Sequence, residues 1–134
     1  MDCSVAAKWV LHEAGHVQAV QLLHEERLGM VTLVAPDLLL TEFASLIAKR
    51  TRRKQIPPDQ ANHSFSLMEQ SAPMLFDTRP LVGAALNLAV DHHLSLWDCV
   101  YLALAIALDC PFITADRRLF RGGVSRHPAI RLLG

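Results

Sequence analysis

The 134-residue sequence has few cysteines and few aromatic residues, and it has no excess of charge of either sign. The three cysteines, Cys3, Cys99 and Cys110, form no CxxC pair and no zinc-knuckle spacing, which is typical of reduced thiols in a cytosolic protein. The 13 basic and 13 acidic side chains balance, so net charge neither favours nor excludes a nucleic-acid partner. With 51% hydrophobic residues the chain can bury a core, which excludes intrinsic disorder.

Long apolar runs and flexible linkers are also absent. The longest apolar stretch, Val100 to Leu108, is too short to span a bilayer. Asp2 and Lys8 interrupt any apolar run of the kind found in a signal peptide. No repeat and no Gly/Ser-rich segment divides the chain. We therefore expect a single domain over residues 1–134 that is soluble, cytoplasmic and free of membrane contacts.

Apolar residues recur mostly at helical spacing, with short β-rich runs between them. Helices are expected over residues 18–28, 38–53, 60–71, 81–90 and 96–108. Asp37 and Ser95 are the expected N-caps of the second and the last of these. Strands are expected over 31–35, 74–76, 112–115 and 129–133. This alternation predicts an α/β domain with a small parallel sheet that helices cover on both faces.

Two acidic residues stand where such a sheet places its functional crevice, beyond the carboxyl ends of the strands. Asp116 directly follows the predicted strand over 112–115, and Asp98 lies in the first turn of the most apolar helix. Glu42 also lies among apolar neighbours. A buried carboxylate is costly unless it reaches water, a cleft or a cation. Carboxylates that crowd together repel each other, and a hard cation such as Mg²⁺ or Mn²⁺ relieves the repulsion.

Each acid also has an ordinary structural explanation. Asp98 follows Ser95 by three residues, which is the spacing of a capping box. Asp116 could cap the next turn, Glu42 could lie on the wet face of its helix, and Asp2 could be a solvated terminal residue. No one of these acids therefore identifies a site by itself.

Four segments, taken in order, resemble the PIN-domain family. They are DCSVAAKW at 2–9, APDLLLTE at 35–42, LSLWDCVYLA at 94–103 and ITADRRL at 113–119. Within that superfamily they look most like the VapC-type toxins of bacterial toxin–antitoxin pairs. The resemblance covers nearly the whole chain.

The resemblance implies a PIN-like three-layer α/β/α sandwich that acts as a Mg²⁺- or Mn²⁺-dependent endoribonuclease. The catalytic and metal-binding positions of the family correspond to Asp2, Glu42, Asp98 and Asp116. The small hydroxyl residues that line the family's site correspond to Ser4 and Thr114. It further implies a homodimer that acts on RNA and is neutralised by a VapB-like antitoxin, whose C-terminal segment covers the acidic site.

The N-terminus departs from this pattern. The family has a short apolar strand before its first Asp, whereas only Met1 precedes Asp2 here. The departure predicts a late start or a trimmed chain. It also predicts that Asp2 is loosely held, as chain termini often are.

Basic residues near the acids are candidate RNA contacts. They are Arg117, Arg118 and Arg121 after Asp116, and Lys49, Arg50 and Arg53 at the end of the helix that carries Glu42. For the second group, favourable charge at a helix C-terminus on a solvated face is as good an explanation as a functional role, which would be contact with phosphate or docking of an acidic partner segment. Trp9, Trp97 and Tyr101 are expected to pack in the core rather than to stack on bases.

Two other functions compete with the nuclease. A PIN-like fold without catalytic activity would serve as an interaction module. The segment from His12 to His16, HEAGH, matches the HExxH pattern of zinc metalloproteases, in which both histidines bind Zn²⁺ from one helix face. Gly15 weakens a helix at that place, however, and seven histidines make a chance match easy.

Overall fold

The computed structural model of the protein describes residues 1–134 and contains seven α-helices, four short strands and one 3₁₀ turn. The helices are α1 (Cys3–Val10), α2 (His16–Arg27), α3 (Leu38–Arg52), α4 (Pro58–Gln70), α5 (Val82–His92), α6 (Leu96–Ala107) and α7 (Arg117–Gly123). The strands are β1 (Val34–Pro36), β2 (Met74–Phe76), β3 (Phe112–Thr114) and β4 (Ile130–Leu132), and the 3₁₀ turn η1 (Arg79–Leu81) precedes α5.

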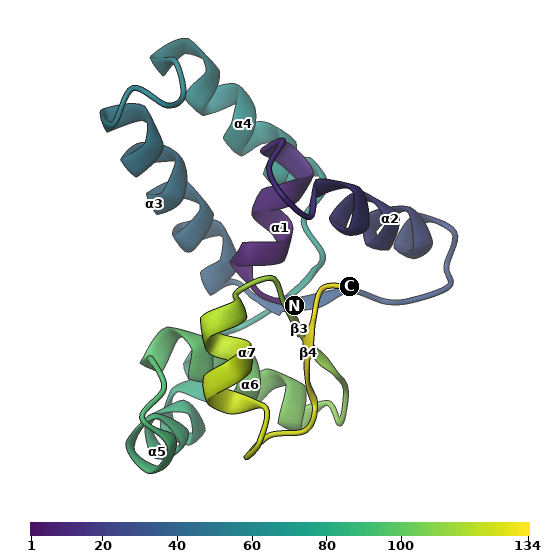
Figure 1. The fold of residues 1–134 in the computed structure, drawn as a ribbon, viewed down its shortest axis with the longest axis vertical. Coiled ribbons are helices and arrows are strands. Elements are labelled where there is room, and N and C mark those ends of the chain that lie inside the picture. Colours follow the sequence, from purple (N-terminus) through teal and green to yellow (C-terminus); the bar gives the residue numbers. More distant parts are fainter.

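The strands pair in parallel, β1 with β2 and β3 with β4. They lie between two groups of helices, α1 to α4 and α5 to α7 (Figure 1), which confirms the predicted α/β layers. The single expected sheet is instead two separate pairs. The N-terminal residues join them, because the Met1 ammonium donates to the Val34 carbonyl at 2.9 Å and the Asp2 amide donates to the Ile113 carbonyl at 3.2 Å.

Helix α6 is the central element of the core. All seven residues from Cys99 to Ala105 are buried, as expected for a helix that is apolar almost all round. Tyr101 on this helix stacks on Phe112 of β3, with 6.1 Å between ring centroids. The sequence therefore places its most apolar helix against a strand, and the first turn of that helix carries Asp98 to the edge of the core.

The two expected N-caps have different outcomes. Ser95 caps α6, since its Oγ accepts a hydrogen bond from the Asp98 amide at 3.1 Å. The prediction for Asp37 is wrong in its mechanism. The Asp37 side chain makes no capping bond and instead accepts hydrogen bonds from the amide and hydroxyl of Thr78, at 3.1 and 2.5 Å. A partner distant in sequence outcompetes the local one here.

The first strand is shorter and later than expected. It begins at Val34 rather than Val31, and both Val31 and Thr32 are exposed. The ladder with β2 starts where the Met74 amide donates to the Leu33 carbonyl at 3.0 Å. No helix of the protein combines the length and the apolar character that a membrane crossing needs.

Candidate active site

Asp2 is the most firmly held residue of the site. Its Oδ1 accepts hydrogen bonds from the amides of Ser4 and Val5, at 3.0 and 3.3 Å, and thereby caps α1. The Ser4 hydroxyl donates to the same oxygen at 2.5 Å, and the hydroxyl of Thr114 donates to Oδ2 at 2.5 Å. Asp2 is only 5% exposed. The expectation of a loosely held Asp2 is therefore wrong.

Ser4 and Thr114 extend this network to the end of β3. The Ser4 Oγ accepts a hydrogen bond from the Ala115 amide at 2.7 Å, and the Thr114 Oγ1 accepts one from the Asp116 amide at 3.0 Å. The two hydroxyl oxygens lie 3.3 Å apart. Each hydroxyl thus connects the first helix to the segment that carries Asp116, so both residues act as positioning residues in this structure.

Glu42, on α3, is held by a residue that the sequence did not single out for the site. The Tyr101 hydroxyl donates a short hydrogen bond to Glu42 Oε2. Tyr101 was expected only to pack in the core, which its ring does. Asp98 and Tyr101 are three residues apart and therefore share a face of α6, and this spacing was the signal available for finding the contact.

Asp98 and Asp116 each stand at a helix N-terminus. Ser95 donates from its hydroxyl to Asp98 Oδ2 at 2.7 Å, while its own oxygen accepts from the Asp98 amide. Asp116 accepts hydrogen bonds from the amides of Arg118 and Leu119, at 2.7 and 3.2 Å, and so caps α7. The capping explanation is correct for Asp116, whereas Asp98 accepts from the Ser95 hydroxyl and not from the Ser95 amide that a complete capping box requires. Capping and a functional role do not exclude each other, because a carboxylate oxygen can accept more than one bond.

The four acids, hereafter the acidic row, form an electrostatic series. Burial raises the pKa of Glu42, and the charges of Asp2 and Asp98 raise it further, against the hydrogen bond from Tyr101. Burial likewise raises the pKa of Asp98, and the neighbouring Asp116 charge adds to this. Burial also raises the pKa of Asp2, which the Ser4 and Thr114 hydroxyls oppose. Each member therefore lies within the electric field of the next.

The acidic row is not a preformed metal cage. No three Asp, Glu, His or Cys side chains of the chain are grouped so that they could hold one ion together. Instead, two clefts flank the row. One of about 450 Å³ contains Glu42, and one of about 360 Å³ contains both Asp98 and Asp116. The structure thus places the four predicted residues so that their charges act on one another in series, and each is held by internal hydrogen bonds.

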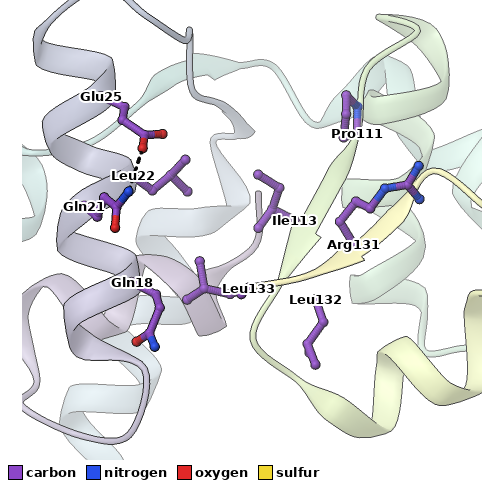
Figure 2. Close-up of a pocket in the computed structure, with 10 residues that line it drawn as sticks. Gln18, Gln21, Leu22, Glu25, Pro111, Ile113, Arg131, Leu132 and Leu133 are labelled. Atoms are coloured by element: carbon purple, nitrogen blue, oxygen red, sulfur yellow. Dashed lines mark hydrogen bonds between the residues drawn. The ribbon is translucent and has the colours of Figure 1, made fainter.

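A third groove of about 480 Å³ lies between α2 and the β3–β4 pair, and its lining contains no member of the acidic row. Figure 2 shows Gln18, Gln21 and Glu25 of α2 on one side and Pro111 and Arg131 on the other. Gln21 donates to Glu25 at 3.0 Å across one helix turn. The lining of this groove mixes polar and apolar side chains as an ordinary surface groove does, and it does not resemble a catalytic centre.

The candidate RNA contacts divide into three groups. Arg118 lines the cleft of Asp98 and Asp116, and Lys49 lines the cleft of Glu42. Arg53 and Arg121 are exposed but line neither of the two clefts, and Arg117 lines a separate cavity. Arg50 instead forms an ion pair with Glu13 at 2.7 Å. Arg50 does lie in the last turn of α3, as the helix C-terminus explanation requires, but its ion pair with Glu13 was not predicted.

The HEAGH segment does not form the helix that a zinc protease requires. Residues 11–15 connect α1 to α2, with Gly15 in the left-handed region at φ 87°, and only His16 is helical. The ring centroids of His12 and His16 lie 4.4 Å apart, and the two ring planes are tilted by 38°. Glu13 is paired with Lys8 at 3.1 Å as well as with Arg50. The metalloprotease hypothesis is therefore wrong.

Comparison with known proteins assigns the family. The model of the PIN domain matches residues 1–123. The chain belongs to the PIN domain family. The VapC ribonuclease Mb0985 of Mycobacterium bovis and the ribonuclease VapC9 of Mycobacterium tuberculosis are each 30% identical over 129 residues, covering 96% of this chain and 93% of the relative. Ribonuclease VapC1 of Mycobacterium tuberculosis is 31% identical over 88 residues, 63% of each chain.

Membership of the PIN domain family confirms the resemblance and the fold class inferred from four short motifs. All four motifs lie within the matched residues 1–123, and so do all members of the acidic row. The part of the chain beyond the match contains β4, which pairs with β3 and so supports the strand that leads to Asp116.

Proposed function

We propose that this PIN domain protein is an endoribonuclease that hydrolyses RNA phosphodiester bonds with Mg²⁺ or Mn²⁺ at the acidic row. The observation that carries the proposal is that carboxylates from separate elements come together: Asp98 of α6 and Asp116 after β3 line one cleft, and the charge of Asp98 acts on Glu42 of α3. Relatives that cover nearly the whole chain are named VapC ribonucleases, which supports the same substrate class.

The donor set suits such an ion. All four side chains offer carboxylate oxygens, the ligand type that Mg²⁺ prefers, and Mg²⁺ commonly keeps several waters and needs few protein ligands. Asp98 and Asp116 share one cleft and are the residues that would hold the ion, and Glu42 lines the neighbouring cleft. Neighbouring charge raises the pKa of both Glu42 and Asp98, and a cation would relieve that repulsion.

When bound, the ion would supply an activated water and would neutralise charge on the scissile phosphate. The chain's own residues hold the carboxylates ready for this. Tyr101 keeps Glu42 oriented, and Ser95 keeps Asp98 oriented. Asp2 fixes Ser4 and Thr114, and through their contacts it fixes the backbone that carries Asp116. Arg118 lines the same cleft and would contact a phosphate of the RNA.

The decisive experiment is cleavage of RNA in Mn²⁺ by Asp98→Asn. Asparagine has nearly the same size and keeps an oxygen for the Ser95 hydroxyl, so the fold should persist. We expect cleavage to fall by about 100-fold or more, because even partners of metal ligands cost 10- to 100-fold when replaced. Asp59→Asn, an exposed acid on α4, is the matched control and should cleave like the wild type.

Activity that survives Asp98→Asn would refute the assigned site. Absence of cleavage by the wild type in both Mg²⁺ and Mn²⁺ would favour the other candidate, an inactive PIN-fold interaction module. The same reaction with a chelator added tests the dependence on metal, because a metal-independent nuclease would remain active.

We further propose that the protein forms a homodimer and is neutralised by a VapB-like antitoxin, both in the cytoplasm. A stripe on α5 supports the dimer. Val82, Leu86 and Val90 are 43%, 54% and 65% exposed at a spacing of four residues, so they form one apolar face. Light scattering should give twice the 14.9 kDa chain mass, and Leu86→Glu should give the single mass. An antitoxin would block cleavage by covering the acidic row, which addition of the purified partner tests.

A further inference from the structure

The three aromatic residues considered for stacking on a base differ in their exposure to solvent. Trp9 is buried, and its indole N–H donates to the Ala19 carbonyl at 2.9 Å. Tyr101 is buried against Phe112 and donates to Glu42. Trp97 is 57% exposed, although the helical pattern predicted that it would pack in the core. A large exposed indole in the first turn of α6 therefore has no structural role in the core.

Trp97 faces a cleft that already contains a member of the acidic row. The cleft has a volume of about 450 Å³, within the range of small-molecule sites. Besides Trp97 and Glu42, its lining comes from α3 and consists of Leu38, Thr41, Ser45, Leu46 and Lys49. It thus combines one aromatic surface, one cation, two hydroxyls and two apolar side chains.

We propose that this cleft binds one nucleotide of single-stranded RNA beside the acidic row, with its base stacked on Trp97. The inference rests on the proposed ribonuclease function and specifies where that substrate is held. The Lys49 ammonium contacts the adjacent phosphate, and the hydroxyls of Thr41 and Ser45 bond to the sugar or the base edge. Stacking on an indole accepts any base, because every base has a π-face.

The arrangement requires an unpaired strand. Bases in a duplex are already stacked on each other, so an aromatic side chain can engage only a base that is free to leave that stack. Trp97 precedes Asp98 directly and shares its cleft with Glu42, so a nucleotide stacked there would place its phosphate near the acidic row. Trp97 acts as a positioning residue in this scheme and takes no part in the chemistry.

Tryptophan fluorescence tests the stacking directly. The chain has two tryptophans, and Trp9 is buried. Trp9→Phe therefore leaves Trp97 as the sole reporter. We expect a single-stranded oligoribonucleotide, added in a chelator to prevent cleavage, to quench that emission. The same oligonucleotide should leave the remaining Trp9 emission of Trp97→Phe unchanged.

Kinetics in Mn²⁺ provide a second readout. Trp97→Ala should raise KM about 5- to 150-fold with little change in kcat, since that is the range for loss of one base–aromatic stack. Trp97→Phe should recover most of the loss, because phenylalanine also stacks. Lys49→Gln should lower the salt dependence of binding by about one phosphate contact. Lys54→Gln, a charge outside the cleft, is its control.

The outcomes separate this inference from the proposed function. Cleavage with unchanged KM in Trp97→Ala, or no quenching of Trp97, would overturn the nucleotide site and leave the nuclease standing. Quenching without any cleavage by the wild type would overturn the nuclease and support the nucleotide site. Trp97 emission that shifts with protein concentration before RNA is added would overturn the site, because a second copy would then cover the indole.

Discussion

Replacing Asp2 separates its structural role from its proposed role in catalysis. Alanine removes the acceptor for two backbone amides and for the hydroxyls of Ser4 and Thr114. Loss of an N-cap costs about 1 kcal/mol. The Thr114 side chain is fully buried, and leaving a buried hydroxyl without its partner costs about 1–3 kcal/mol more. We therefore expect Asp2→Ala to lower the free energy of unfolding by about 2–4 kcal/mol.

The expected change in Tm follows from chain length. An unfolding entropy of about 2.1 cal/mol/K per residue gives about 0.28 kcal/mol/K for 134 residues. The predicted loss therefore corresponds to a fall in Tm of about 7–14 °C, which differential scanning calorimetry measures easily. A fall of less than about 3 °C would refute the reasoning, because the network would then contribute too little to hold the site.

Asp2→Asn is the matched variant. Asparagine caps helices as well as aspartate does and can donate from its amide to the Thr114 oxygen. Burial raises the pKa of Asp2, so the folded state favours the protonated form. The wild type should therefore lose stability relative to Asp2→Asn as pH rises from the unfolded pKa of 3.8 to the higher folded value. At neutral pH Asp2→Asn should therefore melt at or above the Tm of the wild type, and it should lose RNA cleavage. Retention of both would show that Asp2 is purely structural.

Three further predictions concern the surroundings of the acidic row. Tyr101→Phe removes the hydrogen bond that lowers the pKa of Glu42, so the acid limb of the kcat/KM profile should move to higher pH, and an unmoved limb would contradict the assigned contact. Mn²⁺ at ten times its Kd should raise the free energy of unfolding by about 1.4 kcal/mol at pH 7.5, which corresponds to about 5 °C in Tm. The shift should be much smaller at pH 4.5, because carboxyls of raised pKa hold their protons more there. Equal shifts at both pH values would place the ion elsewhere. Glu13→Gln should lower the free energy of unfolding by about 1 kcal/mol or less per ion pair, because the contacts of Glu13 with Lys8 and Arg50 are partly exposed. A calorimetric scan checks this loss, and the cleavage assay should show unchanged activity.

Local signals in the sequence located the part of the site that lies on α6 and β3. Ser95 precedes the most apolar segment of the chain, so both the cap and the buried helix could be predicted. Asp116 follows a short β-rich run, which fixes its place at a strand end. These predictions needed only neighbours a few residues apart in the sequence.

Contacts between distant segments could not be predicted in this way. Tyr101 reaches Glu42 across 59 positions, and Thr114 reaches Asp2 across 112. Asp37 looked like a cap but bonds to Thr78, 41 residues away. Trp97 follows a helical apolar pattern, yet the core ends before it. Hydrophobic periodicity describes which face of a helix is apolar, and it does not describe where the neighbouring elements stop.

The bond between Asp2 and Thr114 has a consequence for synthesis of the chain. Helix α1 is synthesised long before β3, so its capping carboxylate meets its partner only after residue 114 has been made. Asp116 follows, and β4 pairs with β3 still later. A contact between residues so far apart in sequence is expected to form late in folding, because closing the long loop between them costs conformational entropy that only the finished contact offsets. A chain translated only as far as β3 would therefore lack the assembled acidic row, and the proposed cleavage of RNA would begin only once the later segments had been made and packed.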